Sequence, residues 1–408
     1  MSTQPIFDVG GVAMHQPFRI RRLGHFGVNV FDPERSLDFY NRLLGFEISD
    51  RIDFATRLSP EAVATVGPTQ GIFMRHGTDH HSFVLFPQRA VHQANPHYAD
   101  HPELTVNQIT WQVSTLREVV EGYHWFKAQA LKVLRSGRDL PGSNWHFYPT
   151  DPSGHINELY YGIEQIGWNG HSKSGLTHEV KHMQPPELPQ VSEFAEINQV
   201  LGSGLDKIMG WRREPQWPEN FDVGGVLLAR PFKVTRVGPV RFFVNDMAQA
   251  LHFYQHALGL RVTEEVTYQK HRCVFLRANT EHHSLALYPK ALRAELGLPA
   301  HSSLMSCGVQ LGSYQQLVDA QHFLTQQGVS WKVLPAELSP GVAHNAFAID
   351  PDGHLLQLYA AMEQIGWDGR PCPAHLRTVP PVDPAQWPKT LKQNNDGMDG
   401  EVFLGPLN

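Results

Sequence analysis

Apolar and polar residues alternate from His25 to Val30, and most of these residues favour strands, which predicts a β-strand. Asp32 and Pro33 come next and are typical of a helix N-cap followed by the first helical residue. Apolar residues then recur at helical spacing until Gly45, a residue type that commonly ends helices. The pattern therefore predicts a strand followed directly by a helix.

The same pattern starts again further along the chain. Val106 to Val113 again has the character of a strand, and Ser114 is predicted to cap a helix that carries Val119 and Phe126 on its apolar face. Further short β-rich runs complete the pattern, at residues 73–74, 82–86, 131–134, 145–148 and 155–161. Each strand–helix pair is thus followed by three strands, which predicts two βαβββ modules.

The chain also repeats itself over a longer distance. The segment Phe-Asp-Val-Gly-Gly-Val occurs at Phe7 and again at Phe221. The segment Asp-Pro-Ser-Gly-His at Asp151 recurs as Asp-Pro-Asp-Gly-His at Asp350, and Glu-Gln-Ile-Gly-Trp follows both copies. The second copy is about fifteen residues shorter than the first between these motifs. Strand and helix patterns recur in it, so we expect four βαβββ modules in two units.

One position in the repeat changes charge. Glu158 of the first copy corresponds to Gln357 of the second. A carboxylate that is kept in one copy and lost from the other predicts one functional unit and one scaffold unit. Motifs present in both copies are better explained as structural.

These patterns predict an α+β protein with two tandem domains at residues 1–175 and 221–375. The intervening linker, 176–220, contains an amphipathic stretch that predicts a bridging helix. Residues 376–408 are rich in proline at first and lack periodicity, so we expect an extended arm that wraps a neighbour or is partly disordered.

Composition narrows the class of protein. The 408 residues carry a net charge of −6 and contain no basic block, which excludes nucleic-acid and anionic-membrane binding as main functions. No apolar run reaches the length of a membrane span, the N-terminal residues do not resemble a signal peptide, and the 3 cysteines lack metal or disulfide spacing. We therefore expect a cytoplasmic protein. The 24 histidines favour metal or acid–base chemistry.

Together these modules and motifs resemble the vicinal-oxygen-chelate superfamily. More narrowly, the chain resembles the type I extradiol ring-cleaving dioxygenases, such as catechol 2,3-dioxygenases and dihydroxybiphenyl dioxygenases. The resemblance covers roughly residues 20–165 and 235–365. It implies that each pair of modules forms a cupped, barrel-like mixed sheet. It also implies a non-haem metal site that serves aromatic catabolism.

The resemblance implies a set of metal ligands. In this family a histidine in a Leu-Gly-His context opens the first strand of one module, and His25 stands there. The carboxylate ligand follows a Pro-Ser-Gly turn in the last strand of the paired module, where Glu158 lies. The family's second histidine is replaced by Gln108, whose carbonyl oxygen is a harder and weaker donor than imidazole. Fe(II) is the expected metal, with Mn(II), Zn(II) or Ni(II) as alternatives.

The resemblance also implies catalytic residues. His81, the second histidine of the pair that begins at His80, matches the family's acid–base histidine. It would take the second phenolic proton of a catechol and return it as the oxygen–oxygen bond breaks. Tyr148 matches the tyrosine that hydrogen-bonds the substrate. The period of two places His146 on the same strand face, where we expect it to be a supporting hydrogen-bond donor.

The second unit has lost most of this set. Pro239, Ser306 and Gln357 occupy its three ligand positions, and Phe347 replaces the tyrosine, while the histidine pair persists as His282-His283. Each residue also has a structural interpretation when it is taken alone. The histidine pair in the degenerate unit favours a buried structural role for His81, and Phe347 favours a core role for Tyr148.

We therefore expect a metal-dependent dioxygenase that acts on a catechol-like or other dihydroxylated aromatic with O2, and a homo-oligomer. One alternative is a glyoxalase-like isomerase or lyase, in which His81 becomes a further ligand of Zn, Ni or Mn. Another is an aromatic-binding or resistance protein of the same fold without turnover. Oxygen uptake distinguishes the first hypothesis from the other two.

Overall fold

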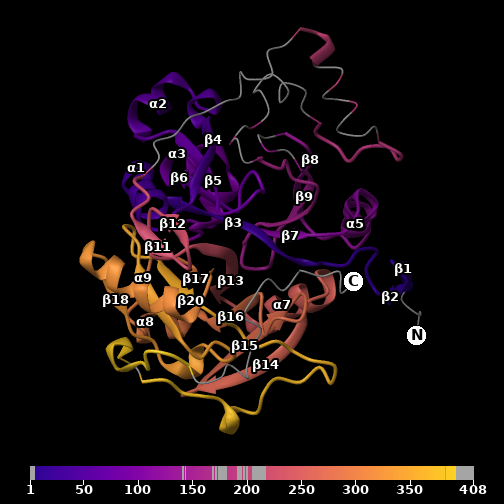
Figure 1. Cartoon of the computed structure of the whole chain (residues 1–408). Coiled ribbons are helices and arrows are strands. Elements are labelled where there is room, and N and C mark those ends of the chain that lie inside the picture. Colours follow the sequence, from indigo (N-terminus) through magenta and orange to yellow (C-terminus); the bar gives the residue numbers. More distant parts are fainter. Residues whose placement is uncertain are drawn as a thin grey trace.

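The computed structural model contains two eight-stranded mixed sheets, one in each unit, and Figure 1 shows the first unit above the second. The described residues are 5–139, 142, 144–167, 170, 172, 182–190, 195, 198, 201–204, 217–381 and 383–391. None of the helices in these ranges is long and apolar enough to cross a membrane.

The sheet of the first unit has the strand order β4-β5-β6-β3-β7-β10-β9-β8. Its strands are β3 (Arg22–Val30), β4 (Glu47–Asp53), β5 (Gln70–Arg75), β6 (Phe83–Pro87), β7 (Val106–Gln112), β8 (Val133–Gly137), β9 (Trp145–Pro149) and β10 (Asn157–Tyr161). Its helices are α1 (Pro33–Leu37), η1 (Asp38–Leu43), η2 (Phe54–Arg57), α2 (Pro60–Val66), α3 (Gln88–Ala94), α4 (His97–Asp100) and α5 (Leu116–Ala128). The two modules join where β3 pairs antiparallel with β7.

The second unit repeats this order as β14-β15-β16-β13-β17-β20-β19-β18. Its strands are β13 (Val234–Val244), β14 (Arg261–Tyr268), β15 (His271–Arg277), β16 (Leu285–Pro289), β17 (Leu304–Leu311), β18 (Trp331–Lys332), β19 (Asn345–Ile349) and β20 (Leu355–Tyr359). Its helices are α7 (Met247–His252), η4 (Phe253–Ala257), α8 (Lys290–Glu295), η5 (Ala336–Leu338) and α9 (Tyr314–Gln326), followed by the short turns η6 (Ala374–Leu376) and η7 (Pro384–Gln386).

The predicted α+β class, the tandem units and the βαβββ modules are confirmed. Asp32 caps α1 as predicted, and its side chain accepts hydrogen bonds from the backbone of Glu34 and Arg35. The predicted cap at Ser114 is wrong by one residue, because Thr115 is the residue whose hydroxyl accepts from the backbone N–H of Glu118. Both residue types can cap a helix, so sequence alone does not choose between them.

Most of the residues missing from the second unit come from one connection. In the first unit β4 and β5 are joined by residues 54–69, which form η2 and α2, whereas residues 269–270 alone join β14 and β15. The first unit therefore carries an extra helical segment beside its sheet.

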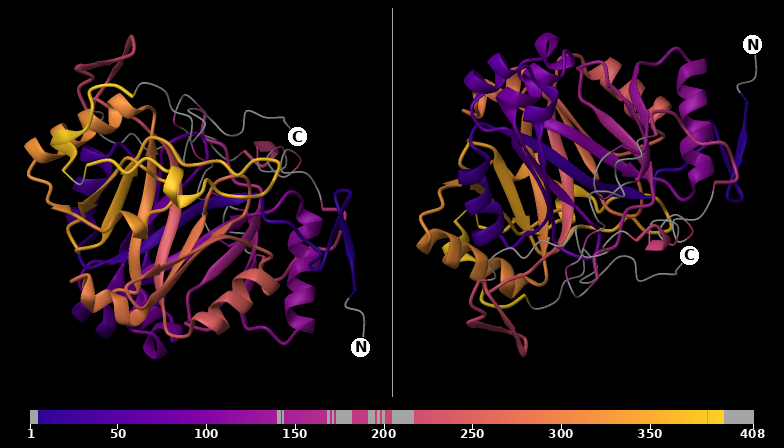
Figure 2. Two further views of the ribbon diagram at one scale, coloured as in Figure 1. Left: turned by 90° about the horizontal axis from the view of Figure 1, so that it is seen from below. Right: turned by 90° about the horizontal axis from the view of Figure 1, so that it is seen from above.

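The repeated Phe-Asp-Val-Gly-Gly-Val segments form two small hairpins. In the first, β1 (Phe7–Val9) pairs with β2 (Val12–Met14), and Asp8 Oδ1 accepts a hydrogen bond of 2.8 Å from Gly11 N. The equivalent hairpin is β11 (Phe221–Val223) with β12 (Val226–Leu228). Figure 2 shows the first hairpin projecting from the body of the molecule beside α5.

The described part of the C-terminal arm packs on the chain's own second unit. Tyr314 donates a hydrogen bond of 2.5 Å to Pro388 O, and the Trp387 ring contacts His344 edge to face at 5.1 Å between centroids. These residues contact their own unit, and the expectation that the arm wraps a neighbour or is partly disordered stays a prediction. The predicted bridging helix, at residues 191–201, lies almost wholly outside the described residues.

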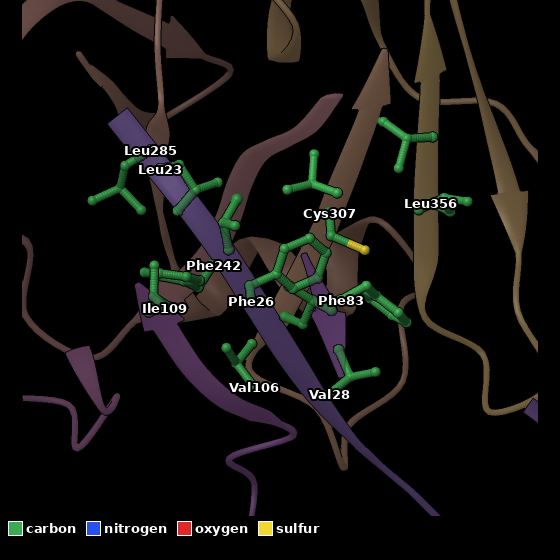
Figure 3. Packing of buried hydrophobic residues seen from close by; sticks show 14 of the residues in the cluster. Leu23, Phe26, Val28, Phe83, Val106, Ile109, Phe242, Leu285, Cys307 and Leu356 are labelled. Carbon is green, nitrogen blue, oxygen red and sulfur yellow. The ribbon is translucent and has the colours of Figure 1, made fainter. Parts of the chain in front are cut away.

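One hydrophobic core connects the two units. Buried side chains of β3 and β13 belong to the same cluster, including Phe26 and Phe242, and Figure 3 shows them packed together. Each sheet therefore turns one face toward this shared core. The opposite face of the first sheet, which carries a separate apolar cluster with Phe73 and Tyr148, is where the candidate site lies.

The repeated Asp-Pro-x-Gly-His motif also joins the units. The buried carboxylate of Asp151 accepts hydrogen bonds of 3.0 Å from His155 Nδ1 and 3.0 Å from the hydroxyl of Tyr254 in the second unit. Asp350 accepts the reciprocal bond of 2.9 Å from Tyr40 of the first unit. Each copy of the motif therefore accepts a hydrogen bond from a tyrosine of the other unit. This structural role agrees with the presence of the motif in both copies.

Candidate functional site

His25 is fixed by an irregularity in β3. The register between β3 and β7 shifts between Leu23 and Phe26, and the Thr110 hydroxyl fills the gap by accepting from His25 N at 2.7 Å and donating to His25 O at 2.6 Å. A side chain at Gly24 would overlap the ring of Tyr160. The Leu-Gly-His sequence therefore has a steric cause, and the imidazole of His25 is 1% exposed.

Glu158 lies on β10, which runs parallel to β7, and its side chain is next to that of His25. Its carboxylate is fully buried, with Oε2 3.4 Å from His25 Nε2 and Oε1 accepting a hydrogen bond of 3.1 Å from Asn144 Nδ2. Burial alone would raise the pKa of this carboxyl, but the neighbouring His25, His146 and Tyr148 outweigh it and hold the pKa below its usual value. Within the described part of the chain, Oε2 receives no hydrogen bond, and such a buried anion is costly unless a cation accompanies it.

His81 approaches the pair from the segment just before β6. Its Nε2 lies 3.2 Å from His25 Nε2, and its Nδ1 lies 3.0 Å from His80 Nδ1. Burial, and then the neighbouring His25 and His80, hold the pKa of His81 well below its usual value, so the imidazole is neutral. One of its two ring nitrogens therefore carries the proton and the other a lone pair. The equivalent histidine of the second unit, His283, indicates which nitrogen has the lone pair.

In the second unit a guanidinium occupies the corresponding space. Arg241, on β13 at the position of Gly27, is fully buried and donates from Nη2 to His283 Nε2 at 3.0 Å. Because a guanidinium can only donate, His283 Nε2 must accept, and its Nδ1–H then donates to His282 Nδ1 at 3.0 Å. His282 Nε2 in turn donates to Glu264 Oε2 at 3.0 Å.

We assign the tautomer of His81 by giving the His80–His81 hydrogen bond the same direction as the His282–His283 hydrogen bond. The His80–His81 contact has the same atoms and the same length as the His282–His283 contact. His81 Nδ1 then donates to His80, and the lone pair of His81 Nε2 faces His25. The first unit thus directs two imidazoles and a carboxylate toward one place, while the second unit fills that place with the fixed cation of Arg241.

A cavity of about 330 Å³ is lined by Gln108 and Tyr148, while His25, His81 and Glu158 lie behind its wall. Gln108 is buried and lies opposite Gly27 in the ladder between β7 and β3. Tyr148 lies under the Arg135 guanidinium, 4.2 Å from its ring centroid. Burial and the charge of Glu158 raise the pKa of Tyr148 well above its usual value, so its hydroxyl remains a hydrogen-bond donor. The rest of the wall is mainly apolar.

Sequence reasoning missed the residue that holds Glu158 directly. His146 was predicted as a supporting donor, and it does contact Glu158 Oε1 at 3.7 Å. The hydrogen bond to the carboxylate, however, comes from Asn144, whose Oδ1 lies 3.1 Å from His146 Nδ1. A signal was available, because the second unit has Ala343 at this position and has also lost the glutamate.

His146 is itself anchored by Asp139. Its Nε2 lies 3.3 Å from Asp139 Oδ1, and Asp139 also pairs with Arg135. Burial opposes ionisation of Asp139, but His146 and Arg135 together lower its pKa to about 2. The carboxylate of Glu158 therefore rests on a connected set of polar side chains.

The ligand set can be tested against this geometry. Ligands at about 2.1 Å from a divalent ion and at right angles lie about 3 Å apart, close to the 3.4 Å between His25 Nε2 and Glu158 Oε2. Among the described residues, no three histidine, cysteine, aspartate or glutamate side chains are arranged to hold a metal ion. His25 and Glu158 thus fit as two ligands, and a third would have another chemistry, such as the amide of Gln108.

Paired βαβββ modules with a buried histidine–carboxylate pair inside one sheet define the vicinal-oxygen-chelate class of protein. In agreement, the chain belongs to the Glyoxalase/Bleomycin resistance protein/Dioxygenase superfamily, whose model matches residues 22–159 and 236–358. The resemblance noted from the sequence is therefore confirmed.

Two curated relatives match part of the chain. Metapyrocatechase 2 of Cupriavidus necator is 32% identical over 163 residues, which cover 38% of this chain and 42% of the relative. The 3-methylcatechol 2,3-dioxygenase of Pseudomonas putida is 26% identical over 148 residues, covering 35% of this chain and 43% of the relative. The matches thus span less than half of each relative's length.

Solved structures show the same fold over most of the chain. A catechol 2,3-dioxygenase superposes with a TM-score of 0.52 at 16% identity, covering 88% of this chain and 91% of that one. The Mn(II)-bound glyoxalase from Novosphingobium aromaticivorans gives a TM-score of 0.52 at 15% identity, covering 95% and 100%. At such identities the likeness establishes the fold alone.

Proposed function

We propose that the protein is a metal-dependent dioxygenase that cleaves the ring of a catechol-like aromatic with O2 in the extradiol manner. The observation that carries the proposal is the buried His25–Glu158 pair, in which Glu158 Oε2 receives no hydrogen bond from any described residue, next to Tyr148 in the wall of the cavity. The dioxygenase relatives favour the same chemistry. The second unit, with Arg241 and Gln357 at its centre, serves as scaffold.

His25, Gln108 and Glu158 would hold the metal, expected to be Fe(II). A divalent iron there supplies sites at which both hydroxyl oxygens of a catechol and O2 can bind as neighbours. Asn144 keeps one carboxylate oxygen occupied, so that Oε2 remains directed toward His25. The apolar side chains of the cavity wall, such as Phe54 and Phe86, would contact and orient the aromatic ring.

His81 acts as the base in this proposal. Its Nε2 lone pair faces the site, so it takes the second phenolic proton of the substrate at that atom and later returns it. His80 positions the imidazole of His81 by accepting a hydrogen bond from its Nδ1–H. This hydrogen bond keeps a proton on Nδ1 and leaves the lone pair on Nε2. Tyr148 donates a hydrogen bond to a substrate oxygen, because its raised pKa keeps the hydroxyl protonated.

Oxygen consumption tests the proposal. Protein loaded with Fe(II) should consume O2 and form a ring-opened product from catechol, with one O2 taken up for each ring opened. An isomerase or lyase of the same fold would turn over substrate without O2, and a binding protein would show neither. The absence of O2 uptake across a panel of substituted catechols would remove the proposed function.

Replacement of His81 by asparagine should separate proton transfer from metal binding. We expect kcat to fall about 10²- to 10⁴-fold, the usual contribution of a general base, while the metal content is unchanged. The exposed His124, on α5, is a matched control, and His124→Asn should leave both quantities as they are. If His81→Asn instead loses the metal, His81 is a ligand, and the isomerase-like alternative gains support.

A further inference from the structure

Among the described residues that line the cavity beside Tyr148, two carry a positive charge and none carries a negative charge. Of its lining residues, Arg57 and Arg135 alone are charged, and the others are apolar or neutral. Arg135 is held in place by Asp139 and by the ring of Tyr148. Arg57 has no carboxylate partner among the described residues and contacts the ring of Phe54, 5.3 Å from its centroid.

The two guanidinium groups are close enough to affect each other. Burial lowers the pKa of Arg57, the positive charge of Arg135 lowers it further, and the carboxylate of Asp139 offsets part of this. Two like charges beside one apolar cavity oppose each other, and an anion placed between them would relieve that repulsion. A carboxylate matches the planar fork of a guanidinium particularly well.

Arg57 belongs to the segment that distinguishes the two units. It ends η2, within the connection of residues 54–69 that the second unit replaces with residues 269–270. Phe54 of the same segment also lines the cavity. The inserted segment is therefore present only in the unit that has the His25–Glu158 pair, and it contributes both an aromatic wall and a cation to the cavity.

We propose that the aromatic substrate carries a carboxylate, which Arg57 binds at the cavity together with Arg135. This inference rests on the proposed dioxygenase function and adds the class of substrate. The hydroxyl groups lie toward Gln108 and Tyr148, and the carboxylate lies toward Arg57. The volume of about 330 Å³ is near the lower end of ligand sites, so the substrate has a single ring rather than two.

A pair of isosteric compounds tests the inference. The probes are 2,3- and 3,4-dihydroxybenzoate, each compared with its own uncharged carboxamide. For the better isomer, we expect kcat/KM of the acid to exceed that of the amide at least about tenfold, the ratio that corresponds to one charge-assisted hydrogen bond at a partly exposed site. Equal or better turnover of the amide would overturn the inference while leaving the dioxygenase function intact.

The substitution Arg57→Met assigns the effect to this residue. It keeps an apolar side chain over Phe54 and removes the charge. We expect kcat/KM to fall about tenfold for the acid and to change less than about twofold for the amide. Arg89→Met, on α3 at an exposed position that does not line the cavity, is the matched control. An equal fall for acid and amide would mean that Arg57 only supports the wall.

A binding measurement keeps this test independent of catalysis. If no compound is turned over, the dioxygenase proposal fails, and the Kd values of the same acid and amide are then measured by calorimetry under nitrogen. Tighter binding of the acid by about tenfold, lost in Arg57→Met, supports the carboxylate site. Equal Kd values for acid and amide contradict it.

Discussion

Glu158→Gln is expected to abolish metal binding and to lower kcat/KM at least about a thousandfold while the protein remains folded. The substitution gives the first unit the residue that the second unit has at Gln357. It removes the negative charge next to His25 Nε2 but keeps an oxygen that can accept from Asn144. Metal content after dialysis, O2 uptake and thermal denaturation of the same sample measure the three parts of this prediction.

The second unit offers a matched control for this variant. Gln357 is fully buried, and neither atom of its amide has a hydrogen-bond partner among the described residues. Gln357→Leu should therefore be neutral or slightly stabilising, and it should leave metal content and activity unchanged. Full metal content in Glu158→Gln, or loss of metal in Gln357→Leu, would contradict the assignment of the site to the first unit.

Asp151→Ala is expected to lower the free energy of unfolding by about 3–5 kcal/mol, the usual cost of breaking a buried charged network. The carboxylate accepts hydrogen bonds from His155 Nδ1, from Tyr254 and from the backbone N–H groups of Ser153 and His155. All of these donors would be left without this acceptor. Urea denaturation followed by fluorescence measures the change.

Two further variants show that the effect comes from contact between the units. Tyr254→Phe removes the interunit hydrogen bond to Asp151, together with the 3.5 Å contact from Asn157 Nδ2, and should cost about 1–2 kcal/mol. Combined with Asp151→Ala, it should add little, because the two residues share one interaction. Asp8→Ala, in the exposed first hairpin, should cost less than about 1 kcal/mol. A mild Asp151→Ala, or full additivity with Tyr254→Phe, would mean that the units do not depend on this connection.

The fold was predictable because its signals are local and repeated. Alternation marked β3 from His25 to Val30, and Asp32 with Pro33 marked the start of α1, as the structure confirms. The boundaries were less accurate, since β3 begins at Arg22 and the helix cap lies at Thr115. These differences arise from tertiary contacts and from neighbouring residues with similar capping ability.

The candidate site was predictable only in part. His25 and Glu158 were predicted from the sequence and lie 3.4 Å apart, whereas their roles remain predictions. Asn144 was missed although the second unit has Ala343 at this position, because the sequence does not show that its side chain donates to Glu158, fourteen residues further along the chain. Arg241 was also missed, since an arginine in an apolar strand gives no local sign that it fills the centre of a sheet.

Arg241 explains how the second unit keeps its shape without the ligands of the first. Its guanidinium donates one hydrogen bond to His283 Nε2 and another, of 3.2 Å, to the hydroxyl of Ser339. A permanent cation there makes a bound metal unnecessary for packing. The duplicated sheet can therefore serve as scaffold in one unit and keep a site for chemistry in the other.

A crystal structure of the protein loaded with Fe(II) without oxygen, with anomalous scattering measured at the iron edge, tests the central claim most directly. We expect a single strong peak within bonding distance of His25 Nε2 and Glu158 Oε2, and none beside Gln357. A first unit without a peak, or a peak bound to other side chains, would contradict the proposed metal site.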